Sequence, residues 1–225
     1  MALVPLNLPA GVYRNGTDLQ SQGRWRDSNL VRWFDDTLQP IGGWRTRSDT
    51  ASDKQVRGMH SWIDNSSDRW ISAGSYNKLY VYSGAGIRYD ITPTGFTAGN
   101  ENALTPVGYG NSFYGLEYYG TPRQEAVTIT PATTWSMDSW GQYLVACSST
   151  DGKVYEWQLS TGTIAAVVAN APVNNRAILV TEERFLMCLG AGGNPRLVQW
   201  SDREDNTVWT PAATNEAGSL ELQTT

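Results

Sequence analysis

The sequence predicts an all-β protein built from a repeated hairpin, and two observations lead to that prediction. Residues 143–157 hold an apolar run, a polar turn that ends in Asp151 and Gly152, and a second run in which apolar and polar residues alternate. A period of two is typical of a strand with one buried face, and Asp-Gly between two such runs is a strong hairpin signal. The second observation is that this pattern occurs three times.

The pattern recurs at residues 70–82 and 185–200. Each copy has an aromatic residue, an apolar run, a turn rich in Gly, Asn or Asp, and then the order basic, apolar, any, any, aromatic. From Lys153 to Arg196 is 43 residues, which matches the roughly 40 to 50 residues of a four-stranded propeller blade. From Lys78 to Lys153 is 75 residues, so this unit carries an insertion of about 30 residues.

Each hairpin also has a candidate strand on both sides, which makes each unit four strands long. These flanking strands are predicted at 56–63 and 86–92, at 135–140 and 162–168, and at 177–181 and 206–209. We therefore expect a β-propeller-like repeat of three short antiparallel blades. A closed propeller needs four or more blades, so either the chain is the N-terminal part of a longer product or a partner completes the fold.

The remaining segments give the expected domain organisation. Residues 1–55 form an N-terminal extended arm and a hairpin, with strands at 30–34 and 38–41 around a turn at Asp35 and Asp36. The first unit spans 56–93, a Gly/Tyr-rich insertion spans 94–134, and the second and third units span 135–225. Hydrophobic residues make up 40% of the chain and charged residues 17%, which is typical of a globular protein.

Basic and aromatic residues alternate in the arm and hairpin. Arg24, Arg26 and Arg32 lie close in sequence to Trp25 and Trp33, and this arrangement has two interpretations. One is a stacking platform for nucleic acid. The other, which we favour, is arginines that stack on the tryptophans or pair with Asp27, Asp35 and Asp36 at a blade edge or subunit contact.

The insertion combines glycines with tyrosines. Tyr109, Tyr114, Tyr118 and Tyr119 lie among glycines, and tyrosine provides a large contact surface at low entropic cost. Long loops in compact domains are usually functional or disordered. We expect a partner contact here, with a floppy or self-packed surface loop as the alternative.

The sequence contains no convincing catalytic or metal-binding constellation, so we expect a protein that is not an enzyme and has no cofactor. The one histidine, His60, falls in a predicted strand and is interpreted as structural. Asp202, Glu204 and Asp205 lack the spacing of a calcium loop, and we expect Asp202 or Asp205 to bond local backbone amides. Residues 190–195 lack the Lys-Ser/Thr of a phosphate loop and are interpreted as a turn.

Cysteine usage and net charge predict the redox compartment of the protein and argue against nucleic-acid binding. Aligning Tyr143 on Phe185 places Cys147 and Cys188 on opposite faces of equivalent strands, so we expect free, buried thiols in a reducing compartment. The net charge is −5, which gives no basic face for nucleic-acid phosphates. We see no secretory signal and no apolar stretch long enough for a membrane span.

Several ordered motifs resemble a known family. They are L-P-x-G-V-Y-R-N-G-T at residues 8–17, G-R-W-x-D-x-N-L-V-R-W at 23–33, L-x-P-I-G-G-W at 38–44 and W-S-D-R-E-D-N-T-V-W-T-P at 200–211. Together they are similar to the tail nozzle of short-tailed phages, also called the tail hub or packaged-DNA stabilisation protein. Members of that family tend to be much longer than this chain.

The resemblance implies a β-propeller subunit of a ring, usually of six copies, below the portal and adaptor proteins. Such a ring lies in the virion tail, is assembled in the host cytoplasm, and docks tail fibre or spike and plug proteins. Viral DNA passes through its lumen without sequence-specific binding, and an acidic lumen would let the genome slide. The expected subunit contacts involve Arg24, Trp25, Trp33, Trp44 and the tyrosines of the insertion.

A second hypothesis is a carbohydrate-binding propeller that recognises a receptor, because the chain is rich in Trp and Tyr. However, Tyr80, Tyr82, Tyr155 and Trp157 fall at strand positions where core packing is the default. We therefore favour the structural ring subunit.

Overall fold

The computed structural model describes residues 11–35, 37–103 and 130–223. It divides into two units, Met1–Thr46 and Arg47–Thr225, and each is described by itself. In the first unit, β1 (Val31–Phe34) pairs antiparallel with β2 (Thr37–Pro40). This is the predicted hairpin, and Asp35 lies in its turn with φ 48°, a left-handed conformation that Asp tolerates.

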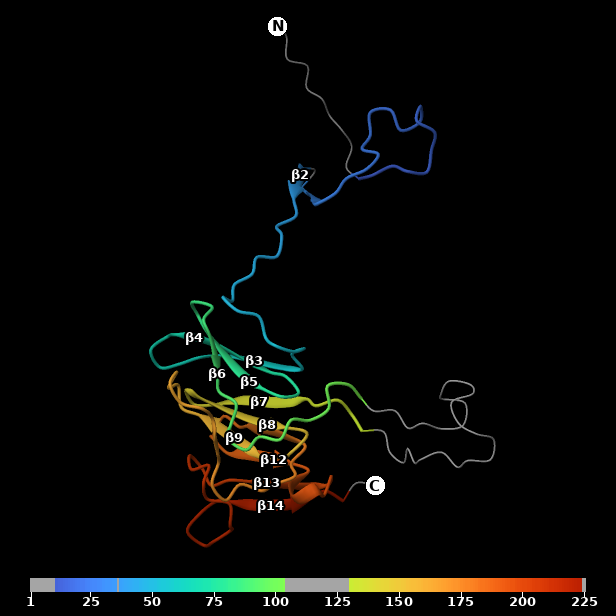
Figure 1. The fold of residues 1–225 in the computed structure, drawn as a ribbon. Helices are drawn as coiled ribbons and strands as arrows, with labels where there is room; N and C mark the ends of the chain where they lie inside the picture. The colour runs from blue at the N-terminus through green and yellow to red at the C-terminus, as the bar shows by residue number, and fades with distance from the viewer. Residues whose placement is uncertain (1–10, 36, 104–129, 224–225) are drawn as a thin grey trace, which may run out of the picture. The chain divides into compact units, whose positions relative to one another are not determined.

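The second unit contains three four-stranded antiparallel sheets, each formed by strands that are consecutive in the chain (Figure 1). The first sheet comprises β3 (Gly58–Ile63), β4 (Arg69–Gly74), β5 (Leu79–Ser83) and β6 (Arg88–Asp90). The second comprises β7 (Trp135–Trp140), β8 (Tyr143–Ser148), β9 (Val154–Trp157) and β10 (Ala166–Val167). The third comprises β11 (Ala177–Val180), β12 (Leu186–Leu189), β13 (Leu197–Trp200) and β14 (Gly218–Glu221), with the short 3-10 helix η1 (Ala191–Gly193) between β12 and β13.

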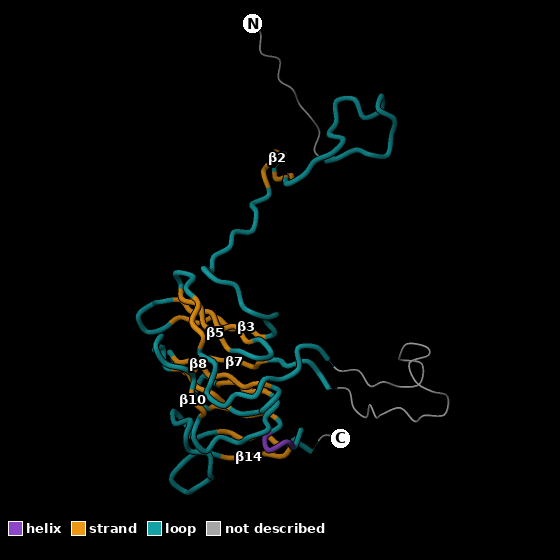
Figure 2. The backbone as a smooth tube through the Cα atoms, in the orientation of Figure 1, coloured by secondary structure: helices purple, strands orange, loops and turns teal. Residues whose placement is uncertain are grey.

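The chain is therefore all-β, as predicted, and the three expected hairpins are β4–β5, β8–β9 and β12–β13. In Figure 2 almost every regular element is a strand. The described residues contain no helix long and apolar enough to span a membrane. The three sheets do not close into a ring within the described part of the chain.

One predicted strand was wrong. Residues 206–209 form a turn rather than the last strand of the third sheet, and β14 takes that place. Trp209 is buried with its indole N–H donating to the Asn206 carbonyl at 2.7 Å, and the Asn206 side chain donates to the Glu156 carboxylate of the second sheet. The segment therefore covers the second sheet instead of extending the third.

The sheets are stacked, and the second lies between the other two. Leu144 and Ala146 of β8 belong to a hydrophobic cluster shared with the first sheet, whereas Val145 and Cys147 belong to a cluster shared with the third. Side chains alternate along a strand, so the two faces of the second sheet have different neighbours. We call the two faces of each sheet its front and its back. The back of the first and second sheets faces the next sheet of the stack, and the front of the second and third sheets faces the previous one. The front of the first sheet and the back of the third are therefore the two ends of the stack.

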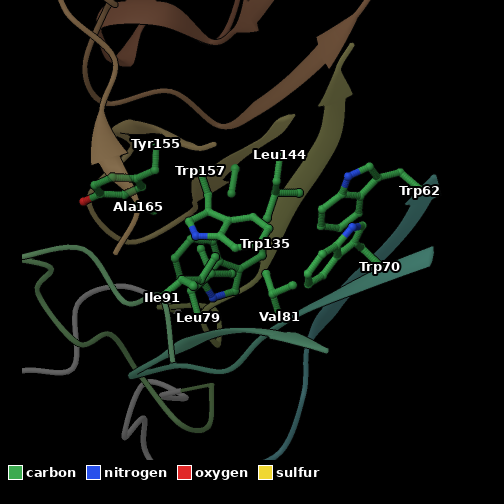
Figure 3. Packing of buried hydrophobic residues seen from close by; sticks show 11 residues of the cluster. Trp62, Trp70, Leu79, Val81, Ile91, Trp135, Leu144, Tyr155, Trp157 and Ala165 are labelled. Atoms are coloured by element: carbon green, nitrogen blue, oxygen red, sulfur yellow. The ribbon is translucent and has the colours of Figure 1, made fainter. Parts of the chain in front are cut away.

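A tryptophan packs at the interface between the first and second sheets, which we call the first interface. Trp157, at the end of β9, is 1% exposed and meets Trp62 and Trp70 of the first sheet edge to face, with ring centroids 6.5 and 5.4 Å away. Figure 3 shows these indoles among the aliphatic side chains of the cluster. Edge-to-face geometry is a favoured aromatic arrangement. The front of the second sheet thus inserts an indole between two tryptophans on the back of the first.

The first strands of the sheets are also joined by polar contacts. The Ser136 hydroxyl of β7 donates to the Ile178 carbonyl at 2.9 Å and accepts from its N–H at 3.1 Å, while the Asp138 carboxylate accepts from the Val180 N–H at 2.8 Å. These side chains satisfy the backbone groups on the free edge of β11. Between the first two sheets, His60 Nε2 lies 2.8 Å from Ser139 Oγ.

Candidate assembly surfaces

The arginines of the first unit do not stack on its tryptophans, which corrects one part of the sequence interpretation. Trp25 and Trp33 meet each other, with ring centroids 6.1 Å apart at 61°. Arg24 instead lies over the Tyr13 ring at 5.2 Å and Arg32 over the Phe34 ring at 5.8 Å.

The ion pairs of this unit also differ from the expected ones. Arg26 pairs with Asp18, and Asp27 is bound by Arg14 at 2.8 Å. All four side chains are mostly exposed, so these pairs contribute little stability.

The other predicted contact residues are spread along the chain. Trp44 is fully exposed. Tyr109, Tyr114, Tyr118 and Tyr119 lie outside the described residues. Among the described residues, the structure therefore brings together Trp25 and Trp33, and the exposed Trp44 does not pack against them.

The ends of the predicted insertion are packed into the sheet stack. Phe96 contacts the rings of Trp135 and Tyr155, with centroids 5.2 and 6.3 Å away, and the Thr133 N–H donates to the Asn100 carbonyl at 3.0 Å. The Thr133 hydroxyl lies 2.7 Å from that of Thr150. The stems of the insertion are thus part of the first interface.

The front of the first sheet, which is only partly exposed, resembles the buried front of the second residue by residue. In the first sheet, Met59, Ala73 and Tyr80 lie opposite one another across β3, β4 and β5. Met137, Ala146 and Tyr155 make the same row in the second sheet.

The next row along the strands repeats in the same way. It consists of Ser61, Ile71 and Tyr82 in the first sheet, and of Ser139, Leu144 and Trp157 in the second. In the second sheet these rows pack against the first sheet. In the first sheet, Met59 and Ile71 are 67% and 37% exposed.

Residues 47–53, which precede the first sheet in the second unit, cover the outer part of this front face. The Asp49 N–H donates to the Gly86 carbonyl at 2.9 Å, and Asp53 pairs with Lys78 at 3.2 Å and Arg88 at 3.1 Å. Burial and the nearby Asp53 raise the pKa of Tyr80 to about 12. The segment therefore leaves β3 and residues 69–71 of β4 as the open part of the front, whereas Ala73 and Tyr80 are buried.

The back of the third sheet is the second open face, and it is apolar. The register places on it Ala177 and Leu179 of β11, Met187 and Leu189 of β12, Val198 and Trp200 of β13, and Leu220 of β14. Thr181, Phe185, Met187 and Trp200 line a hollow of about 230 Å³ on this face, and its lining is entirely apolar. Most of these side chains are half-buried and Leu220 is exposed. Contiguous apolar surface of this kind marks sites of interaction.

Asp202 and Asp205, which lack the spacing of a calcium loop, bind backbone N–H groups instead. The Asp202 carboxylate accepts from the N–H groups of Arg203 and Glu216 at 2.9 and 2.8 Å, and the Asp205 carboxylate accepts from the Thr207 N–H at 2.9 Å. The predicted backbone bonds of both aspartates are confirmed. No group of three His, Cys, Asp or Glu side chains lies close enough to hold a metal ion within the described residues.

Both cysteines are free and buried. Cys147 lies on the back of the second sheet and Cys188 on the front of the third, so they occupy opposite faces of equivalent strands, as predicted, and share one cluster. Burial raises the pKa of Cys147 to about 12 and also raises the pKa of Cys188. Neither thiol is activated as a nucleophile, because the thiolate is the reactive form.

His60 links the first two sheets, and burial lowers its pKa despite the nearby charge of Asp138. A lowered pKa means that the unfolded state binds the proton better, so the contribution of neutral His60 is present above pH 6.5 and lost as the pH falls. We expect the unfolding temperature to drop between pH 7 and 5, and the His60→Gln variant to show a smaller drop. Thermal unfolding followed by circular dichroism measures this.

His60 is the only histidine in the chain, which makes the comparison clean. The Ser61→Ala variant, which changes a neighbouring side chain on the opposite face of β3, is the control and should retain the wild-type pH dependence. An equal drop in the wild type and in His60→Gln would contradict the role assigned to His60.

Sequence reasoning missed both open faces, although a signal for one of them exists. Met59-His60-Ser61-Trp62 and Met137-Asp138-Ser139-Trp140 share the pattern M-x-S-W, and the repeat template covered only the hairpins. The back of the third sheet has no such motif, because its residues are interpretable only once the register is known. Comparisons with protein-family models, curated proteins and solved structures found no match.

Proposed function

We propose that this chain is a structural subunit of a phage tail nozzle or hub, and that its three sheets are blades of a β-propeller. Each sheet is a four-stranded meander. The first strand of the second sheet, β7, makes polar contacts with β3 and β11, the first strands of the other two sheets. In a propeller, consecutive blades are such meanders arranged around a central channel. The three sheets supply fewer blades than a closed propeller needs.

The observation that carries the proposal is that, among the described residues, both ends of the stack leave apolar side chains uncovered, with Met59 and Ile71 at one end and Leu220 at the other. The front of the first sheet repeats the residues of a buried front, and the back of the third sheet is apolar with a hollow. A fold with such ends is completed by further β-sheet, which suits a protein whose work is assembly. The phage context comes from the sequence motifs at residues 8–17, 23–33, 38–44 and 200–211.

The aromatic residues that motivated a carbohydrate-binding role give it little support. Tyr80, Tyr155 and Trp157 are at most 1% exposed, so they cannot stack on a sugar without unfolding. Within the ring proposal, the net charge of −5 suits a lumen through which DNA slides without specific contacts. Portal, adaptor, fibre or spike, and plug proteins are the partners that this role implies, and the virion tail is the location.

Electron microscopy of the purified protein, alone and mixed with its portal-adaptor complex, tests this proposal. We expect ring-shaped particles, of six copies by the family resemblance, that attach to the adaptor end of the complex. A protein that stays monomeric and does not bind the adaptor would contradict the role of a ring subunit.

A further inference from the structure

We propose that the front of the first sheet in one copy of the chain packs against the back of the third sheet in a second copy. The contact is head to tail, and its occupant is another molecule of the same protein. This inference rests on the proposed role as a ring subunit and specifies which surfaces the copies use.

The chain already makes a contact of this kind within itself. The front of the second sheet packs on the back of the first through Met137, Leu144, Tyr155 and Trp157. The equivalent positions on the front of the first sheet are Met59, Ile71, Tyr80 and Tyr82. The open front therefore has the chemistry of a surface that packs on the back of another sheet.

The open back has the matching chemistry. In the first sheet, Trp62 and Trp70 pack on Trp157, and Ser72 and Val81 form the next row of the same face. The equivalent residues of the third sheet are Thr181, Phe185, Met187 and Trp200, and these four line the hollow of about 230 Å³. The hollow is thus in the place where the first sheet receives the Trp157 indole.

The same equivalence identifies the side chain that would enter the hollow. Trp157 lies opposite Leu144 in the second sheet, and Tyr82 lies opposite Ile71 in the first. Tyr82 of a second copy is therefore the counterpart of Trp157, with Ile71 beside it in place of Leu144. The aromatic ring of a tyrosine suits an apolar hollow at the rim of an interface, because its hydroxyl can remain in water.

The segment that covers Tyr80 does not block this contact. The equivalent tyrosine of the second sheet, Tyr155, is likewise covered by a connecting segment through Phe96, with ring centroids 6.3 Å apart. The second sheet still packs on the first through Leu144 and Trp157. Tyr80 and Tyr155 are therefore covered in the same way in the two sheets. The contact with the next sheet is made by the neighbouring row, which is Leu144 and Trp157 in the second sheet and Ile71 and Tyr82 in the first.

Charge also favours a front-to-back arrangement over two like faces. Residues 47–92, which build the first sheet, contain six Lys or Arg and five Asp or Glu, for a net charge of +1. Residues 176–223, which build the third sheet, contain four Lys or Arg and seven Asp or Glu, for a net charge of −3. The two sheets thus have net charges of opposite sign, which favours a contact between a first and a third sheet over one between two third sheets.

Two single variants and their mixture test the proposal. Ile71→Lys places a cation on the front, and Met187→Glu places an anion on the back, each in an otherwise apolar contact. We expect wild-type protein to sediment at a multiple of 24.8 kDa and each variant alone to dissociate at least about 30-fold more readily. A 1:1 mixture should reassemble, because the lysine of one variant then meets the glutamate of the other.

Ile164→Lys is the matched control, since Ile164 is an exposed isoleucine (47%) of the segment between β9 and β10, away from both open faces. It should sediment as the wild type. Circular dichroism and the unfolding midpoint show that each variant is folded. If Ile71→Lys lowers the midpoint, Met59→Lys replaces it as the front variant, because Met59 is more exposed.

The outcomes separate the contact from the proposed function. Loss of association in both variants with recovery in the mixture supports the head-to-tail contact. Oligomers that persist in both variants, or no recovery in the mixture, overturn this contact and leave the role of a ring subunit standing. Wild-type protein that is monomeric at every concentration, with no adaptor binding, overturns both.

Discussion

The variant Trp157→Ala is expected to lose about 3–5 kcal/mol of unfolding free energy, as large buried aromatic truncations do. The indole is 1% exposed and fills the space between Trp62 and Trp70, so alanine would leave a cavity between the first two sheets. Its N–H also donates to the Ser160 and Thr163 carbonyls, at 3.1 and 3.2 Å, and these bonds would be lost. Urea unfolding followed by tryptophan fluorescence and circular dichroism measures the change.

Two variants serve as controls for this result. Trp44→Ala removes the same side chain at a fully exposed position and should change the unfolding free energy by less than about 0.5 kcal/mol. Trp157→Phe keeps an aromatic ring and should lose less than Trp157→Ala. A loss below about 1 kcal/mol for Trp157→Ala would show that the first two sheets do not depend on this packing.

The variant Gly152→Ala is expected to lose about 3 kcal/mol, from two separate causes. Gly152 has φ 60°, a left-handed conformation that costs other residues about 1–2 kcal/mol. A Cβ at this position would also lie 2.4 Å from the Asn174 Cα and 2.5 Å from the Asn175 nitrogen. Because these are backbone atoms, the segment leading into the third sheet would have to shift.

Gly192→Ala separates the two causes. Gly192 has a similar φ of 66°, but a Cβ there would meet no atom within 4 Å. This variant should lose only the conformational part, about 1 kcal/mol. Equal losses in the two variants, measured by urea unfolding, would contradict the close packing of the β8–β9 turn against the chain that follows.

The hairpins of the second unit were predictable because their signals are local. The Asp151-Gly152 turn and the alternation of residues 153–157 determine strand, turn and register within a few residues of each other. The opposite facing of Cys147 and Cys188 follows from the same period of two. All-β structure, the three hairpins and the N-terminal hairpin could therefore be derived from sequence.

The remaining features depend on contacts between distant residues. Residues 206–209 have strand-forming side chains, but burial of Trp209 against the second sheet holds them in a turn. The arginines near Trp25 and Trp33 had several aromatic and acidic neighbours available, and sequence spacing does not rank Tyr13 above a tryptophan. The open back of the third sheet emerges only from the pairing of β12 with β13 and β14.

Packing between the three sheets accounts for much of the aromatic content of the second unit. The largest buried side chains include Trp157, Tyr80 and Tyr155, and each belongs to a face that meets another part of the chain. The repeat uses these faces for packing between sheets. The faces left over at the two ends are consequently suited to the same task between molecules.

A cryo-electron microscopy map of the assembled protein tests the central claim most directly. It should show three equivalent four-stranded sheets in each chain, with Trp157 between Trp62 and Trp70 and with β-sheet from a neighbouring copy covering the hollow at Met187 and Trp200. A map in which the back of the third sheet faces solvent, or in which the three sheets lie in unrelated surroundings, would contradict it.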